Sequence, residues 1–229
     1  MTIRSIASLA HLLRLASPGL PVGAYSYSQG LESAIEAGTV QNEATALLWI
    51  SDGLRYVVAR CEAPIALRLY RAWASKNPDA VRHWNAFFLV TRETAELRAE
   101  TVQMGYSLKR LLSELGTHYR IAKAVLDSLD PCSFPAAFSF AACAAGVDDR
   151  DMLLGLLWAW AENQVTTALK AVPLGQSAGQ RLLCALIELL PDTIAEIVGL
   201  DDSALSNFAP ALAIASCQHE TQYSRLFRS

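Results

Sequence analysis

DRDMLLGLLWAW, at residues 149–160, is the stretch of sequence that decides the fold. Apolar side chains cover every side of a helix built from it, so this helix must be surrounded by other elements. We therefore place it at the centre of the protein. Asp148 or Asp149 fits its first residue, and Pro173 ends it because proline cannot continue a helix.

On both sides of this segment, apolar residues recur at helical spacing between turn residues. A first helix ends at Ser17-Pro18-Gly19, and a second runs from Ser28 or Gln29 to a Gly38 cap. A third helix follows an Asn42 cap, a fourth has Pro64 in its first turn, and a fifth is capped by Asp79. Further helices are predicted at 91–115, 121–129, 136–145, 177–190, 194–199 and 210–219, with a turn at Pro191-Asp192. Small residues in 136–145 predict a close helix approach. No segment shows the period-two alternation of a half-buried strand.

The fold class predicted is therefore all-α, a single-domain helical bundle of roughly ten helices covering residues 1–229. Hydrophobic residues make up 52% of the chain and charged residues 18%, which excludes a disordered protein. So few charges also predict apolar surface patches, and hence a protein partner or a homodimer. The net charge of -3 argues against a nucleic-acid partner, which needs a clustered basic surface.

The predicted location is cytoplasmic, with no membrane segment. The Ala-rich stretch 131–147 is interrupted by Pro135 and is too short to span a bilayer. The first residues open directly into a helical pattern and lack the features of a secretory signal. Five scattered cysteines with no Cys-x-x-Cys pair are typical of reduced, buried thiols.

No catalytic residue is predicted. The two glycine-rich segments, 19–25 and 175–180, lack the lysine of a phosphate-binding loop, so we expect no bound nucleotide. There is no Gly-x-Ser-x-Gly nucleophile motif. The expectation is a protein that is not an enzyme and binds no cofactor directly.

The metal prediction is also negative, because His11, His83, His118 and His219 are far apart in the sequence. The weak candidates are Cys217 and His219, in the cluster Cys217-Gln218-His219-Glu220. Side chains two residues apart on a helix point in different directions, which disfavours a shared ion. The alternative is that His219 closes the helix electrostatically.

Carboxylates also recur at one-face spacing in the long charged segment. Glu96 lies three residues after Glu93 and four before Glu100. We interpret these residues as a solvated helix face with local salt bridges to Arg92, Arg98 or Arg110.

Two segments are unusual enough to indicate contact surfaces. The connection 17–30 is long for a helical protein and carries Tyr25 and Tyr27 among prolines and glycines. The last residues, 221–229, place aromatic and leucine side chains between two arginines, a composition typical of interface anchors. The alternatives are that the tyrosines pack inward and that the tail docks on its own domain.

These two segments, LPVGAYSYSQGLE at 20–32 and QHETQYSRLF at 218–227, together with AVPLGQ at 171–176 and ELR at 96–98, resemble the UreF family of urease accessory proteins. The resemblance covers nearly the whole chain. It implies an all-helical protein that dimerises and helps to insert nickel into urease, in company with UreD (also called UreH), the GTPase UreG and the urease apoprotein. Nickel would be handled by the complex and GTP by UreG.

From the resemblance we assign a partner-facing loop to Tyr25, Ser26, Tyr27 and Gln29. A partner-binding tail at about 220–229 carries Tyr223, Arg225, Leu226 and Phe227. Three alternatives remain open. The protein modulates the GTPase activity of UreG, for example through Arg225, or it is a nickel-binding metallochaperone that uses Cys217 and His219. The third is a helical hydrolase whose site is assembled from residues distant in the sequence.

Overall fold

The structure, a computed structural model, describes residues 5–116 and 123–229. Within these ranges the chain forms eleven α-helices, two 3-10 turns and one π-helical segment, and no strand. In chain order they are α1 (Ile6–Leu15), η1 (Ala24–Ser26), α2 (Leu31–Glu36), α3 (Glu43–Gly53), η2 (Leu54–Glu62), α4 (Ala63–Ala74), α5 (Pro78–Val90), α6 (Ala95–Leu115), α7 (Lys123–Ser128), α8 (Phe134–Ala144), α9 (Asp149–Ala171), α10 (Gln176–Gly199), η3 (Asp202–Ala204) and α11 (Pro210–His219). The all-α prediction is confirmed. The start of the helix expected at 121 lies outside the described residues.

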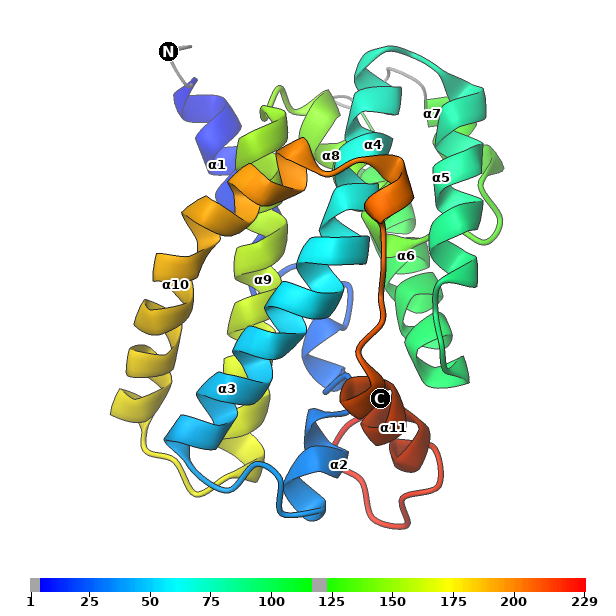
Figure 1. Ribbon diagram of the computed structural model, residues 1–229. Helices are drawn as coiled ribbons and strands as arrows, with labels where there is room; N and C mark the ends of the chain where they lie inside the picture. The colour runs from blue at the N-terminus through cyan, green and yellow to red at the C-terminus, as the bar shows by residue number, and fades with distance from the viewer. Residues whose placement is uncertain (1–4, 117–122) are drawn as a thin grey trace.

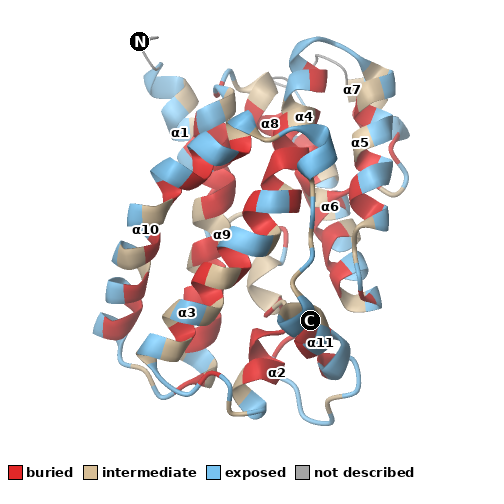
Figure 2. Cartoon of the chain, in the orientation of Figure 1, coloured by how far each residue is buried: buried red, intermediate tan, exposed pale blue. Residues whose placement is uncertain are grey.

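Helix α9 occupies the centre, as its all-round apolar sequence predicts. It packs against α1, α2, α3, α4, α8 and α10 (Figure 1). Met152, Leu153 and Leu157 are completely buried. Asp148 caps the helix by accepting a hydrogen bond from the backbone N–H of Asp151 at 2.8 Å. The helices around α9 carry buried residues on one side and exposed residues on the other (Figure 2).

Helices α6 and α8 approach each other very closely. On α8, Ala136, Ala137, Ala141 and Ala142 have no exposed surface, which confirms the predicted tight packing. On α6, a Cβ placed on Gly105 would lie 2.1 Å from the carbonyl oxygen of Cys132. Only glycine therefore fits at this contact.

The chain from α3 to α4 is one continuous rod in spite of Pro64. Its middle part, η2, is π-helical, and Pro64 lies in the first turn of α4. Proline has no N–H to donate to the preceding turn. In that turn, the carbonyl of Arg60 accepts a hydrogen bond from the backbone N–H of Ser206 at 3.1 Å. This bond anchors the extended segment 200–209, which runs along the rod to α11 (Figure 1).

The predicted turn at Pro191 is wrong, because α10 continues through it to Gly199. Pro191 and Ile187, whose carbonyl would have bonded to residue 191, are on the exposed side of α10. On this side water can bond to the carbonyl that lost its helical donor, while Leu190 and Ile197 stay buried on the other side. Burial of that apolar face outweighs the cost of the proline.

Two helix starts also differ from the expectation. Asn77, two residues before Asp79, caps α5 by accepting a hydrogen bond from Ala80 N–H at 3.0 Å. The long charged helix begins at Ala95 after a Thr94 cap, and residues 91–94 form a separate connection after α5. Asn and Thr are both preferred N-cap residues, so each of these two helices starts at a suitable cap close to the predicted one.

Gly105→Ala is expected to destabilise the protein by about 1–3 kcal/mol or more, because the added methyl meets the backbone of residues 132–133 rather than a flexible side chain. Urea unfolding at equilibrium measures this change. Gly199→Ala at the end of α10 is the matched control, since nothing lies within 4 Å of its added Cβ. Equal stabilities for the two variants would contradict the close α6–α8 contact.

Candidate functional site

The two unusual segments of the sequence meet in the structure. We call residues 220–229 the arm and residues 17–30 the loop. The arm returns from α11 to the loop, where Arg228 N–H donates to the carbonyl of Ser26 at 2.8 Å. Ser28 N–H donates to the carbonyl of Ser229 at 2.7 Å, and the Ser28 hydroxyl donates to the same oxygen. Two segments almost 200 residues apart in sequence thus form one assembly beside α2 (Figure 1).

A buried carboxylate on α2 binds the backbone of the arm. Glu32 is 6% exposed. Its two oxygens accept hydrogen bonds from the backbone N–H groups of Leu226 at 2.6 Å and Phe227 at 3.0 Å. Hydrogen bonds to an ionised acceptor are stronger than neutral ones, so this carboxylate fixes the path of the arm.

His219, at the end of α11, lies between two carboxylates and has no exposed surface. Its Nε2 is 3.1 Å from Glu32 and its Nδ1 is 2.6 Å from Glu96. A neutral imidazole donates from only one nitrogen, so both contacts require a second proton, on the ring or on one carboxyl group. We call Glu32, Glu96 and His219 the clasp, because it joins α2 and α6 to the end of α11.

Further arm residues bind the start of α6. Arg225 Nη1 lies 2.6 Å from the second oxygen of Glu96. Glu220 accepts from the backbone N–H groups of Ala95 at 2.8 Å and Glu96 at 3.3 Å. These N–H groups have no helical partner, and a negative charge at a helix N-terminus is favourable.

The interpretation of Glu96 and Glu100 as a solvated face is therefore wrong. Glu100 is 6% exposed, and Glu96 pairs with the arm rather than with a neighbouring arginine of its own segment. The expected partners bond elsewhere: Arg92 to Glu62, Arg98 to the carbonyl of Leu89 and Arg110 to Glu114. Spacing alone placed these carboxylates on one side of α6 but did not show that the arm covers that side.

Glu100 connects the loop and the arm by accepting a hydrogen bond from each of them. One oxygen accepts from Gln29 Nε2 at 2.7 Å and the other from the Ser229 hydroxyl at 3.0 Å. Gln29 in turn accepts from the indole N–H of Trp160 at 2.7 Å. Burial raises the pKa of Glu100 from 4.5 to about 7, although both donors favour the charged form.

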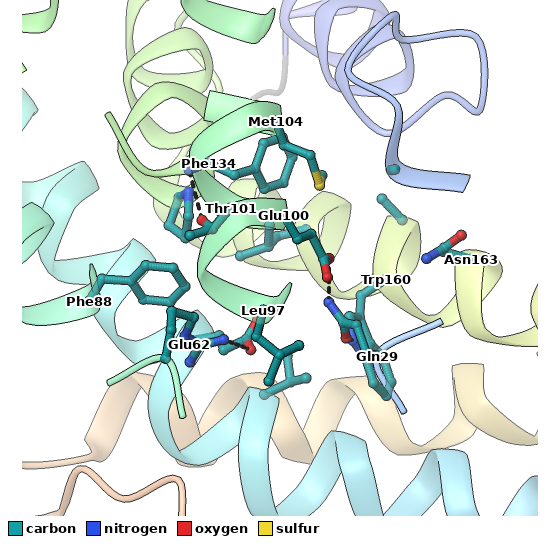
Figure 3. Close-up of a pocket in the computed structure, with 16 residues that line it drawn as sticks. Gln29, Glu62, Phe88, Leu97, Glu100, Thr101, Met104, Phe134, Trp160 and Asn163 are labelled. Atoms are coloured by element: carbon teal, nitrogen blue, oxygen red, sulfur yellow. Dashed lines mark hydrogen bonds and ion pairs between the residues drawn. The ribbon is translucent and has the colours of Figure 1, made fainter. Parts of the chain in front are cut away.

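Glu100 also faces a cavity of about 90 Å³ between α6, α9 and η2 (Figure 3). Its wall is mostly apolar, with Phe88, Leu97 and Trp160 among the lining residues. Two buried polar atoms of lining residues, Arg92 Nε and Asn163 Oδ1, have no hydrogen-bond partner in the described part of the chain. The cavity is roomy and polar enough for water.

The loop residues of the predicted partner site face the protein. Tyr25 donates to Glu162 at 3.0 Å, and burial, then the Glu162 charge, raises the pKa of its phenol. Tyr27 is buried, and burial followed by the charge of Glu100 raises its pKa. Ser26 is half-buried and gives its carbonyl to the arm, while Gln29 bridges Trp160 and Glu100. Ser26 therefore binds the arm directly and Gln29 is linked to it through Glu100, whereas Tyr25 bonds to α9.

The arm residues divide into two groups. Phe227 is buried and lies beneath Lys170, whose ammonium is 5.5 Å from the ring centroid. Tyr223 is fully exposed, Leu226 is 72% exposed, and Arg225 lies partly exposed between them. Tyr223, Arg225 and Leu226 are therefore available to another protein, and their partner role stays a prediction.

The weak metal candidates point apart, since Cys217 is exposed and His219 is buried in the clasp. Across residues 5–116 and 123–229, no group of three or more His, Cys, Asp or Glu side chains is arranged to hold a metal ion. His118 lies outside the described residues.

Sequence reasoning singled out neither Glu32 nor Glu220 as functional. Both stand inside the two motifs that carry the family resemblance, at 20–32 and 218–227, so a signal was present. Nothing local marks either one as the acceptor of a distant backbone or helix N-terminus.

Comparison with known proteins shows the family of this chain. The family model of UreF matches residues 40–187. The chain belongs to the UreF family. It is 55% identical to the urease accessory protein UreF of Azoarcus sp. (strain BH72) over 223 residues, 96% of this chain and 95% of that protein. The UreF of Dechloromonas aromatica (strain RCB) is 49% identical over 228 residues, 99% of this chain and 100% of the relative.

The loop and the arm lie outside residues 40–187, but these relatives of the UreF family match nearly the full length of the chain. The loop and the arm of the site thus come from the parts of the sequence that precede and follow the residues matched by the family model. Among the described helices, none combines the length and the apolar character needed to cross a bilayer.

His219→Ala is expected to destabilise the protein by roughly 3–5 kcal/mol, because it leaves two largely buried carboxylates without their shared partner. Limited proteolysis should then cut within residues 220–229. Chemical denaturation and the site of cleavage measure both effects. Cys217→Ala, two residues away and exposed, is the matched control. A His219→Ala variant as stable as the control would exclude the clasp.

The raised pKa of Glu100 predicts that the stability of the protein depends on pH. The folded form keeps the proton to higher pH than the unfolded chain, so the free energy of unfolding should fall as pH rises from about 4.5 to about 7. The contribution is on the order of 3 kcal/mol. Glu100→Gln should remove it, since a glutamine accepts from Gln29 and donates to Ser229 without a charge. Urea unfolding across this pH range is the measurement.

Glu188→Gln, at an exposed position of α10, is the control for Glu100→Gln and should keep the wild-type pH profile. A Glu100→Gln profile parallel to that of the wild type would show that Glu100 is not the group responsible.

Proposed function

We propose that this chain acts in the maturation of urease as a non-enzymatic adaptor. It brings UreD (UreH), the GTPase UreG and the urease apoprotein together in the cytoplasm while nickel is inserted, and it holds neither nickel nor nucleotide itself. Membership of a family of urease accessory proteins supports the biological setting. The lack of a phosphate-binding motif or a catalytic motif in the sequence supports the adaptor role.

The observation that carries the proposal is the ordered arm. Glu32 accepts hydrogen bonds from the backbone N–H groups of Leu226 and Phe227, so the exposed Tyr223 and Leu226 side chains project from an ordered backbone. Interfaces commonly concentrate their binding energy in a few aromatic, arginine and apolar anchors. A segment that is already ordered loses less conformational entropy when a partner binds.

The chain acts as a homodimer in this proposal. Exposed apolar side chains on α1 support self-association, since Ile6 is 89% exposed and Leu13 is 65% exposed. Sedimentation equilibrium measures the mass. A monomer at micromolar concentration would remove the homodimer from the proposal and leave the adaptor role in place.

The function as a whole is tested with the urease operon of a host in which this gene is deleted. The expected result is urease apoprotein with little nickel and little activity, restored by the wild-type gene. The tagged protein should co-purify with the other accessory proteins. Full nickel loading without this chain, or an absence of co-purification, would overturn the proposal.

Regulation of the GTPase activity of UreG is an alternative to the role of a passive bridge. Arg225 is engaged with Glu96 in this conformation, which favours a positioning role over direct contact with a phosphate. GTP turnover by UreG, measured with and without this chain, distinguishes a bridge from a regulator. A bridge leaves the turnover unchanged.

Tyr223→Ala combined with Leu226→Ala is expected to weaken association with the other accessory proteins at least tenfold, because the two most exposed apolar anchors of the arm are lost. The free energy of unfolding should change by less than about 0.5 kcal/mol, since both side chains are exposed. Pull-down and denaturation measure the two effects. Tyr106→Ala on α6, 56% exposed and outside the arm, is the control. Equal binding by both variants would exclude the arm as a contact surface.

A further inference from the structure

A second surface, separate from the arm, lies where the segment 200–209 reaches α11. A groove of about 240 Å³ opens there between the end of α3, the start of η2 and the start of α11. We call it the aromatic groove; it is lined by Trp49, Asp52, Gly53, Tyr56, Phe208, Ala209, Pro210, Ala211 and Leu212. None of these residues belongs to the arm or the loop.

The rim of the groove exposes large apolar side chains. Phe208 is 81% exposed and Tyr56 is 56% exposed. Leu48 and Ile214, on the neighbouring turns of α3 and α11, are 63% and 58% exposed. Single exposed apolar residues are common, but a cluster around a hollow is typical of a contact site.

Phe208 is held in its exposed position by the fold. Ser206 N–H donates to the carbonyl of Arg60 at 3.1 Å. Asn207 Nδ2 bonds to the carbonyl of Thr91 at 2.7 Å, and Phe208 N–H bonds to the Ser206 hydroxyl at 3.2 Å. Immediately afterwards, Pro210 begins α11. The ring therefore stands on a fixed backbone rather than on a free loop.

The floor of the groove is rigid as well. A Cβ on Gly53 would lie 3.3 Å from Trp160 and 3.5 Å from Leu212, so α3 and α11 approach closely here. A groove with fixed walls and floor is preorganised, and a partner loses little free energy in shaping it.

Asp52 gives the groove its charge. It is the one charged residue of the lining and is half-buried. Within the described residues it forms no hydrogen bond or ion pair. A carboxylate partly removed from water next to aromatic rings favours a cation, which gains both an ion pair and a contact with the ring faces.

We propose that the aromatic groove binds a segment of another protein that places an arginine or lysine side chain on Asp52 and an apolar side chain against Phe208. The charge of Asp52 selects the cation, and the exposed rings select the apolar neighbour. The volume is below the ~300–1,000 Å³ of a typical small-molecule site, and the groove is open, which suits side chains of a polypeptide. This contact extends the adaptor by a surface that the arm does not use.

The test uses the full-length chain and three probe peptides: acetyl-Leu-Arg-Leu-amide and its glutamine and glutamate counterparts. Titration is followed by NMR at the Trp49 indole N–H and the Phe208 backbone N–H. The arginine peptide should give saturable shifts at both positions. The glutamine peptide should bind at least fivefold more weakly, and the glutamate peptide should give no shifts. Added salt should weaken binding of the arginine peptide.

Asp52→Asn should raise the dissociation constant of the arginine peptide about tenfold. Phe208→Ala should raise it by a similar factor. Asp192→Asn on α10 and Leu115→Ala at the end of α6, both exposed and outside the lining of the groove, are the matched controls and should bind as the wild type does. Thermal unfolding of all four variants shows that each is folded.

Three outcomes would overturn the inference. Equal binding of the arginine and glutamine peptides would remove the role of Asp52. Stronger binding of the glutamate peptide would assign the groove to the N-terminus of α11, which favours an anion. A dimer that Phe208→Asp dissociates in sedimentation experiments would make a second copy of this chain the occupant. None of these outcomes depends on urease maturation, so the adaptor proposal stands or falls separately.

Discussion

Three buried or largely buried carboxylates of the helical body, Glu32, Glu96 and Glu100, have to be neutralised or hydrogen-bonded. The body alone does not supply enough donors. Those donors come from the other end of the chain: the His219 ring, the Arg225 guanidinium, the backbone N–H groups of residues 226 and 227, and the Ser229 hydroxyl. Breaking a buried charge pair costs roughly 3–5 kcal/mol, so the arm contributes to stability as well as to surface.

The helices around α9 set the positions of these carboxylates. Glu96 and Glu100 are one turn apart on α6, and the Gly105 contact with residues 132–133 fixes how closely α6 can approach α8. The direction of α6 also presents its N-terminus to Glu220. Since the site depends on this approach, the small side chains of α8 matter to the arm although they are remote from it.

An adaptor benefits from surfaces that are ordered before a partner arrives. The arm is fixed by backbone hydrogen bonds, and the segment 200–209 is fixed by the bond from Ser206 N–H to the carbonyl of Arg60. In both places an exposed apolar side chain, Leu226 or Phe208, projects from an ordered backbone. The two surfaces lie on opposite ends of α11, so one short helix positions both of them (Figure 1). This arrangement fits a protein that contacts more than one partner.

The sequence by itself determined the helical class, the central place of α9, the close contact made by the small residues of α8 and the family, because periodicity, capping residues and motifs are local properties. It did not determine that Glu96 and Glu100 face the arm, that Glu32 accepts the backbone of residues 226 and 227, or that α10 continues through Pro191. Those features depend on groups that lie up to 200 residues apart. Only tertiary packing decides which side of a helix is covered and whether burying an apolar face outweighs the cost of a proline.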